Sequence, residues 1–169
     1  MRHPLRSWTT TPVLVLTSLI AAAALVHLLL IFPAFVKGDE FRFLSDIYNL
    51  NRGTLRGLFQ NFQVHLFRWL PAVGGDEIHQ IMVARTGYFF LLLGSCSLLF
   101  SLSRAFLSRE ASLFAVFCLL AFGQVLTTGT SFRFDGITVF FFLAALASLL
   151  RGRLSRGFPH PRNRGAGKV

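Results

Sequence analysis

The sequence predicts an all-α membrane protein with four transmembrane helices and an outer loop that contains amphipathic interfacial helices. Three observations support this prediction. Apolar residues make up 53% of the 169-residue chain and charged residues only 14%, which is too little charge to cover a soluble domain. The apolar residues come in long runs and not at amphipathic spacing. The basic residues lie between these runs and in the C-terminal segment, which is typical of a topology signal and not of a nucleic-acid-binding face, so no nucleic-acid partner is expected.

The first apolar run, residues 12–36, is expected to be a signal-anchor and the first spanning helix, behind a short basic N-terminus at residues 1–11. A cleavable signal peptide would have an apolar core of roughly 7–15 residues and a small-residue cleavage site, and this run fits neither. His27 lies in the middle of the run. Two interpretations stay open: a neutral, buried histidine bonded to a neighbouring helix, or a proton-relay or ligand role.

A polar loop at residues 37–80 follows, and it is predicted to contain two helices. Apolar residues at helical spacing indicate a short helix over 41–48 and an aromatic-rich amphipathic helix over 55–70, the latter lying on the membrane interface. Pro71 and two glycines are expected to end the second helix. Asp76 is then expected to cap the next helix, because its carboxylate can accept hydrogen bonds from free backbone N–H groups.

The remaining apolar runs predict three more spanning helices, at about residues 83–102, 111–128 and 136–150. The last of these is short for a membrane crossing, which usually needs about 20 residues. Cys96 and Cys118 fall inside apolar runs and are predicted to be inert thiols. Residues 151–169 are basic and contain proline and glycine, so a disordered tail is expected there.

The distribution of charge predicts which side each loop occupies. With the N-terminus inside, the inner segments hold ten of the 17 basic residues and one acid, Glu110. The outer segments hold the other six acids. Basic residues favour the cytoplasmic side. We therefore expect an integral multi-pass protein of the cell membrane, with both termini cytoplasmic and loop 37–80 extracytoplasmic.

This topology brings five charged residues to one membrane surface, where they form the candidate site. Asp39 and Glu40 directly follow a membrane exit; a carboxylate there could act as a general base or could simply cap a helix. Asp39 is also the candidate ligand for a divalent cation, Mg²⁺ or Mn²⁺. The planar guanidinium of Arg133 presents paired N–H donors that suit a phosphate, and Asp135 could orient it or cap the last helix. Arg85 is a further candidate for binding phosphate.

Three stretches resemble the GT-C glycosyltransferases, and more narrowly the dolichyl-phosphate-mannose (polyprenyl-phosphate-sugar) protein mannosyltransferase-like group. They are Gly75-Asp76-Glu77 through Arg85, residues 102–111, and Phe132-Arg133-Phe134-Asp135 with the apolar helix that follows it to Arg151. The resemblance covers roughly residues 12–151. It implies a multi-pass inverting enzyme that moves a sugar from a polyprenyl-phosphate donor to an acceptor on the outer face. It further implies Asp39 as the catalytic or metal-linked carboxylate, with Glu40 beside it and with Arg133 and Asp135 near the donor phosphate.

The chain also departs from that family, which leaves a second class of function open. Residues 63–66 take the place of a His-Pro-Pro type segment without its prolines, and family members have more helices. The chain is therefore expected to be a truncated N-terminal part or a short relative. The alternative is a non-enzymatic small integral membrane protein that acts as an assembly or accessory subunit, with membrane lipids and other membrane subunits as its partners. Small residues at 21–24 and 144–148 would let its helices pack closely.

Overall fold

The described part of the chain is built from helices. The computed structural model describes residues 10–32, 36–55 and 61–155, and no strand occurs among them. The elements are α1 (Thr10–Leu30), α2 (Gly38–Asn51), α3 (Asn61–Leu66), the 3₁₀ helix η1 (Leu70–Val73), α4 (Glu77–Ser103), α5 (Arg109–Ala121), α6 (Gly123–Thr128) and α7 (Phe134–Ser155). The all-helical prediction is confirmed.

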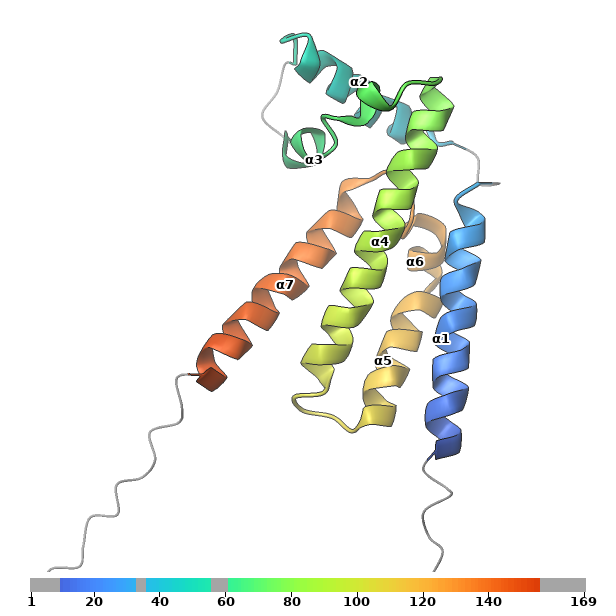
Figure 1. The fold of residues 1–169 in the computed structure, drawn as a ribbon, viewed down its shortest axis with the longest axis vertical. Helices are drawn as coiled ribbons and strands as arrows, with labels where there is room; N and C mark the ends of the chain where they lie inside the picture. The colour runs from blue at the N-terminus through green and yellow to red at the C-terminus, as the bar shows by residue number, and fades with distance from the viewer. Residues whose placement is uncertain (1–9, 33–35, 56–60, 156–169) are drawn as a thin grey trace, which may run out of the picture.

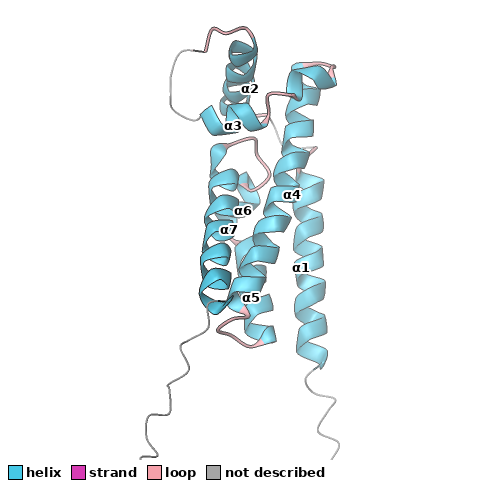
Figure 2. Cartoon of the chain, turned by 60° about the vertical axis from the view of Figure 1, so that its left-hand side comes forward, coloured by secondary structure: helices cyan, strands magenta, loops and turns pink. Residues whose placement is uncertain are grey.

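The helices form a bundle with a small cap at one end (Figure 1). Helix α4 packs against α7, α5 and α1, and α1 packs along α5. Helices α2 and α3 lie across one end of this bundle, next to the start of α4 and the turn before α7 (Figures 1 and 2). We call residues 38–73, which include α2, α3 and η1, the cap. The start of α1 and the end of α7 both lie at the opposite end of the bundle (Figure 1).

Three helices of the described chain are long and apolar enough to cross a membrane. They span Thr11–Leu30, Glu77–Ser103 and Phe134–Arg151, and few of their residues are buried inside the protein. Apolar side chains such as Leu14 and Phe142, 66% and 67% exposed, need a lipid or protein environment. The predicted membrane protein is confirmed at this level.

The third predicted helix, at 111–128, is divided in the structure. Phe122 has extended dihedral angles, φ −65° and ψ 125°, and separates α5 from α6. Neither piece alone has the length of a membrane crossing. Gly123 follows the break, and glycine has a low helix propensity because it loses the most backbone entropy on ordering.

The other helix boundaries also differ from the predicted ones. Helix α1 ends at Leu30 and not near residue 36, shortly before Pro33, whose ring disfavours helical geometry at the residue ahead of it. Helix α4 begins six residues early, at Glu77, because Asp76 caps it by accepting the His79 N–H at 2.8 Å, as predicted. Helix α7 reaches Ser155, so the predicted tail begins as helix; residues 156–169 and 1–9 lie outside the described chain.

The His27 side chain satisfies a backbone carbonyl at the end of α5, next to the break between α5 and α6. Its side chain is fully buried, and Nε2 lies 3.1 Å from the carbonyl oxygen of Leu120, a residue in the last turn of α5. A carbonyl in the last turn of a helix has no partner within the helix. With a proton on Nε2, the ring donates a hydrogen bond to this oxygen, so His27 is buried and bonded to a neighbouring helix, as the first interpretation expects.

Aromatic packing fixes the cap on the bundle. The Phe67 ring stacks on Tyr88 with centroids 5.4 Å apart, and Phe132 meets both rings edge-on at 5.2 and 5.8 Å. These residues come from the cap, from α4 and from the turn before α7. Burying each aromatic ring stabilises the fold by a few kcal/mol, on the order of 1.5–3 for full burial. The cap is therefore a packed part of the core.

The second predicted loop helix is shorter than expected. Over residues 55–70 the structure has α3, which spans six residues, followed by η1 from Leu70. Residues 56–60 of the predicted helix lie outside the described chain. Gly74 and Gly75 have φ of 76° and 79°, a left-handed conformation that favours glycine, and they turn the chain into α4. A location of α2 and α3 on the membrane interface stays a prediction.

Candidate functional site

A buried ion pair lies at the junction of the cap and the bundle. Glu40, in the first turn of α2, meets Arg85, in the third turn of α4. The Nε and Nη2 atoms of Arg85 donate to Oε1 and Oε2 of Glu40 at 2.9 and 2.6 Å, which is a bidentate arrangement. The two side chains are only 0% and 3% exposed. The pair is thus sealed from solvent by the protein.

Backbone groups complete this ion pair. Glu40 also accepts the N–H groups of Lys37 and Phe132, both at 2.9 Å. Arg85 Nη1 donates to the carbonyl oxygen of Ile31 at 2.9 Å, just past the end of α1. The pair therefore connects α1, α2, α4 and the turn before α7 at one point. Four hydrogen bonds on two carboxylate oxygens leave Glu40 little capacity to accept a proton from a substrate.

The protonation of Glu40 follows from these contacts. Burial taken alone would raise its pKa, since it disfavours the charged form. The hydrogen bond from Arg85 and the two backbone N–H groups outweigh burial, and the pKa of Glu40 lies below its ordinary value of 4.5. Glu40 is accordingly an anion at neutral pH.

The lowered pKa of Glu40 predicts an acid-sensitive fold. The unfolded chain binds this proton more readily, so the stabilisation is fully present above about pH 4.5 and is lost as the pH falls through the lower, folded-state pKa. We expect the melting temperature of the protein in lipid nanodiscs to fall below that pH. The Glu40→Gln variant, which cannot titrate there, should show a shallower fall. Equal slopes for the two proteins would contradict this account.

A second, exposed cluster lies beside the ion pair. Arg133 Nη1 is 3.9 Å from Oδ2 of Asp39, and Arg133 Nε is 3.4 Å from Oδ2 of Asp135. The Nε contact is an ion pair by distance but lacks hydrogen-bond geometry, and no other described residue accepts from this atom. Asp39 and Asp135 are 62% and 50% exposed. This group, which we call the acidic–arginine cluster, unites residues 39, 133 and 135 from distant parts of the sequence.

A cleft of about 430 Å³ lies between the end of α1 and α6. Its charged residues are Lys37 and Arg85, and Lys37 Nζ donates to the carbonyl oxygen of Thr127 at 3.4 Å. The other lining residues are hydroxyl or apolar: Val26, Leu30, Leu126, Thr127, Thr130 and Ser131. Because Arg85 is already neutralised by Glu40, Lys37 supplies the cation of this cleft that still has donor capacity.

The structure brings most of the predicted site residues to one end of the bundle, in two groups. Asp39, Arg133 and Asp135 meet directly, whereas Glu40 and Arg85 form a separate buried pair. Of the two adjacent acids, Asp39 alone keeps its carboxylate accessible. Sequence reasoning missed Lys37 and the hydroxyls at residues 127–131. The signal was present: the stretch Thr127-Thr128-Gly129-Thr130-Ser131 is a dense hydroxyl run beside an apolar helix.

The residues present do not form a metal site of the usual kind. In residues 10–32, 36–55 and 61–155, no three His, Cys, Asp or Glu side chains come together. Asp39 and Asp135 flank the guanidinium of Arg133, which offsets one of their two negative charges. Divalent cations prefer a larger set of oxygen ligands. The Mg²⁺ or Mn²⁺ ion suggested by the sequence stays a prediction, and no reaction step is derived through it.

The fold and these two groups define a helical membrane protein with a capped end that carries charged residues. Comparison with known proteins adds no relative: no family model matches the chain, and no curated protein or solved structure is detectably similar. The functional argument therefore depends on the geometry at the capped end.

Proposed function

We propose that the chain is a multi-pass membrane glycosyltransferase, or part of one, that transfers a sugar from a polyprenyl-phosphate donor to an acceptor on the extracytoplasmic face. The observation that carries the proposal is the acidic–arginine cluster. It pairs an accessible carboxylate with a guanidinium whose side chain is partly exposed, at the end of three apolar helices. These are the two groups that displacement of a phosphate leaving group by a hydroxyl requires.

Asp39 acts as the general base in this mechanism. Its carboxylate takes the proton from an acceptor hydroxyl, and the hydroxyl oxygen attacks the anomeric carbon of the donor sugar. The bond between that carbon and the phosphate oxygen breaks, and polyprenyl phosphate leaves with the electron pair. Arg133 lies beside Asp39, with Nη1 3.9 Å from Oδ2, where it can stabilise the negative charge that develops on the phosphate.

The cleft between α1 and α6 suits the donor lipid. Lys37 and the hydroxyls of Thr127 and Ser131 are phosphate-binding groups, and Val26 and Leu126 offer apolar contact to the first isoprene units. In this proposal the capped end faces the extracytoplasmic side, and α5 and α6 together make the fourth membrane crossing. Lys37 is held next to α6 by the hydrogen bond that its Nζ donates to the carbonyl oxygen of Thr127.

The test is a transfer assay with the full chain in proteoliposomes. Labelled polyprenyl-phosphate hexose is supplied as donor, and methyl pyranosides or water serve as acceptor. We expect donor consumption by the natural chain. No consumption with any acceptor overturns the proposal and favours the accessory-subunit alternative.

Lys37→Gln is expected to raise the donor KM about tenfold or more with little change in kcat, because a hydrogen bond to a charged group contributes about 1.5–3 kcal/mol. Arg42→Gln removes an exposed cation from α2, the helix that begins directly after Lys37, at a position outside the cleft, and is the matched control. An equal rise in KM for both variants would mean that general surface charge, and not the cleft, attracts the donor.

A further inference from the structure

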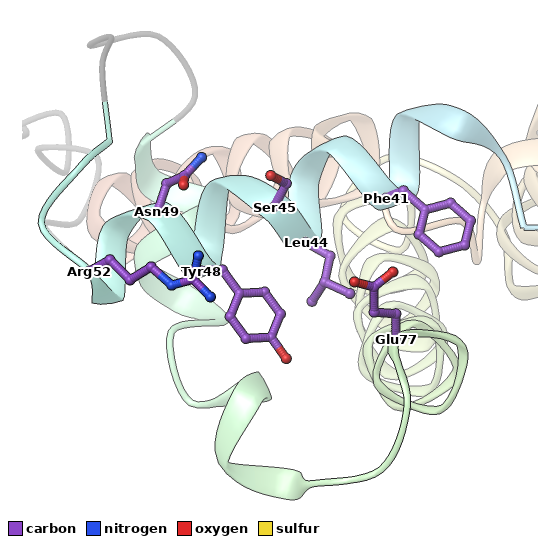
Figure 3. A pocket seen from close by; sticks show the side chains of 7 residues that line it. All are labelled: Phe41, Leu44, Ser45, Tyr48, Asn49, Arg52 and Glu77. Atoms are coloured by element: carbon purple, nitrogen blue, oxygen red, sulfur yellow. The ribbon is translucent and has the colours of Figure 1, made fainter.

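A second polar cleft, of about 390 Å³, lies along one side of α2 (Figure 3). Its lining residues are Phe41, Leu44, Ser45, Tyr48, Asn49, Arg52 and Glu77. Five of them come from α2 at helical spacing, and Arg52, the residue directly after α2, continues the same stripe. Glu77 extends from the start of α4 toward that stripe (Figure 3). We call this the α2 cleft.

The α2 cleft is separate from the acidic–arginine cluster. The face of α2 with Glu40, Phe43 and Ile47 packs into the core. Successive residues are rotated by about 100° around a helix, so Asp39 and the cleft stripe lie on opposite flanks of that buried face. A ligand in the α2 cleft therefore does not touch Asp39.

The α2 cleft has a defined floor. The Tyr48 hydroxyl donates to Oε1 of Gln80 at 3.0 Å, which ties the middle of the stripe to α4. Leu44 is 1% exposed and anchors the same wall in the core. The Arg52 guanidinium carbon lies 5.9 Å from the centre of the Tyr48 ring, so the cation and the ring are held near one another. The cleft is therefore formed before any ligand arrives.

The chemistry of the α2 cleft is that of a site for a polyhydroxylated ring. Glu77 can accept hydrogen bonds from hydroxyls, Arg52 can donate to them, and Ser45 and Asn49 can do both. Neither Arg52 nor Glu77 forms an ion pair with another residue of the described chain. Tyr48 and Phe41 add aromatic surface between these polar groups. A sugar ring presents apolar C–H faces and hydroxyl edges that match this mixture.

We propose that the α2 cleft is a saccharide-binding subsite, which holds pyranose units at a distance from the reacting group. From Phe41 to Arg52 the stripe extends about 16 Å along the helix axis, long enough for more than one sugar ring. Its use to anchor a glycan acceptor depends on the proposed transferase function. Binding energy from a remote part of a substrate can then be used to orient the reacting hydroxyl.

Saturation-transfer NMR with the full chain in lipid nanodiscs tests this proposal. Nanodiscs are needed because maltoside detergents themselves present pyranose rings. The probes are methyl pyranosides of glucose, galactose and mannose, together with phosphoethanolamine as a zwitterion of similar polarity. We expect saturable transfer to at least one pyranoside and none to phosphoethanolamine. No pyranoside signal, or a signal from phosphoethanolamine alone, overturns the proposal.

Variants assign the signal to the cleft. Arg52→Gln and Glu77→Gln should each weaken pyranoside binding at least tenfold. Arg42→Gln and Asp46→Asn change a cation and an acid on α2 outside the cleft and should leave it unchanged. Loss in these controls as well would overturn the assignment. Asp39→Asn separates the two proposals, because it should strongly slow transfer but keep pyranoside binding. Pyranoside binding without any transfer by the natural chain would remove the transferase function alone.

Discussion

Replacing Asp39 by asparagine is expected to lower the rate of sugar transfer by a factor of about 10²–10⁴, the usual contribution of a general base. The amide keeps the size of the side chain but cannot take a proton from the acceptor hydroxyl. The loss should appear in kcat more than in the donor KM, because the interaction that is removed matters in the transition state. The measurement is initial rate against donor concentration in proteoliposomes.

The exposure of Asp39 and a matched control at Asp46 make this experiment interpretable. The side chain is 62% exposed, so the substitution is expected to change the free energy of unfolding by no more than about 0.5 kcal/mol. Asp46→Asn is the matched control, since Asp46 lies on the same helix outside the cluster. Unchanged transfer by the Asp39→Asn variant would remove Asp39 from the mechanism, and an equal loss in the Asp46 variant would indicate a general effect of charge on the cap.

The membrane character and the helices could be predicted because they depend on local sequence. Long apolar runs define the spanning segments whatever their neighbours are. The Asp76 cap was equally predictable, since a cap needs only its own turn. The division of the third helix was not, because residues 111–128 read as one apolar run. Its stable form depends on His27, which comes from α1 and satisfies a carbonyl freed near the break.

The candidate site was predicted only in part, for a similar reason. Charge asymmetry along the chain placed residues 39, 85, 133 and 135 at one end. The charge asymmetry could not show which of the two adjacent acids is buried. Neighbouring residues on a helix point in different directions, so the rotation of α2 about its own axis decides which acid faces the core. Glu40 falls on the core face, opposite Arg85, and Asp39 falls on the flank facing Arg133. Arg85 pairs with the distant acid Glu40, whereas Glu77, on the same helix as Arg85, lines the α2 cleft.

The α2 cleft shows a limit of motif reading. Its residues are common types, and none of them forms a recognised motif. For this part of the chain the sequence predicted only a short helix over residues 41–48. What makes it a cleft is the position of Glu77 after the turn at Gly74 and Gly75, whose positive φ angles direct the chain back toward α2. Such an arrangement depends on tertiary packing and has no signature within either segment.

Replacing Arg85 by methionine is expected to lower the free energy of unfolding by about 3–5 kcal/mol, the largest stability effect of any single change considered for this chain. The variant leaves the Glu40 carboxylate buried without its guanidinium. It also frees the carbonyl of Ile31 from its hydrogen bond. A buried ion pair need not add much to stability overall, but removing one partner leaves an unpaired charge whose desolvation is no longer balanced.

The Glu40→Gln and Arg85→Met double variant distinguishes an unpaired charge from lost packing. Without the carboxylate, no unpaired charge is left buried, so the double variant should be more stable than Arg85→Met alone. A double-mutant cycle of unfolding free energies, measured in mixed detergent and denaturant, tests this. Some loss should remain, because the N–H groups of Lys37 and Phe132 lose a charged acceptor.

Arg42→Gln, an exposed change on α2, should alter stability by no more than about 0.5 kcal/mol. A loss below about 1 kcal/mol for Arg85→Met would mean that the charge reaches water in the folded protein, and the pair would then not fix the cap on the bundle.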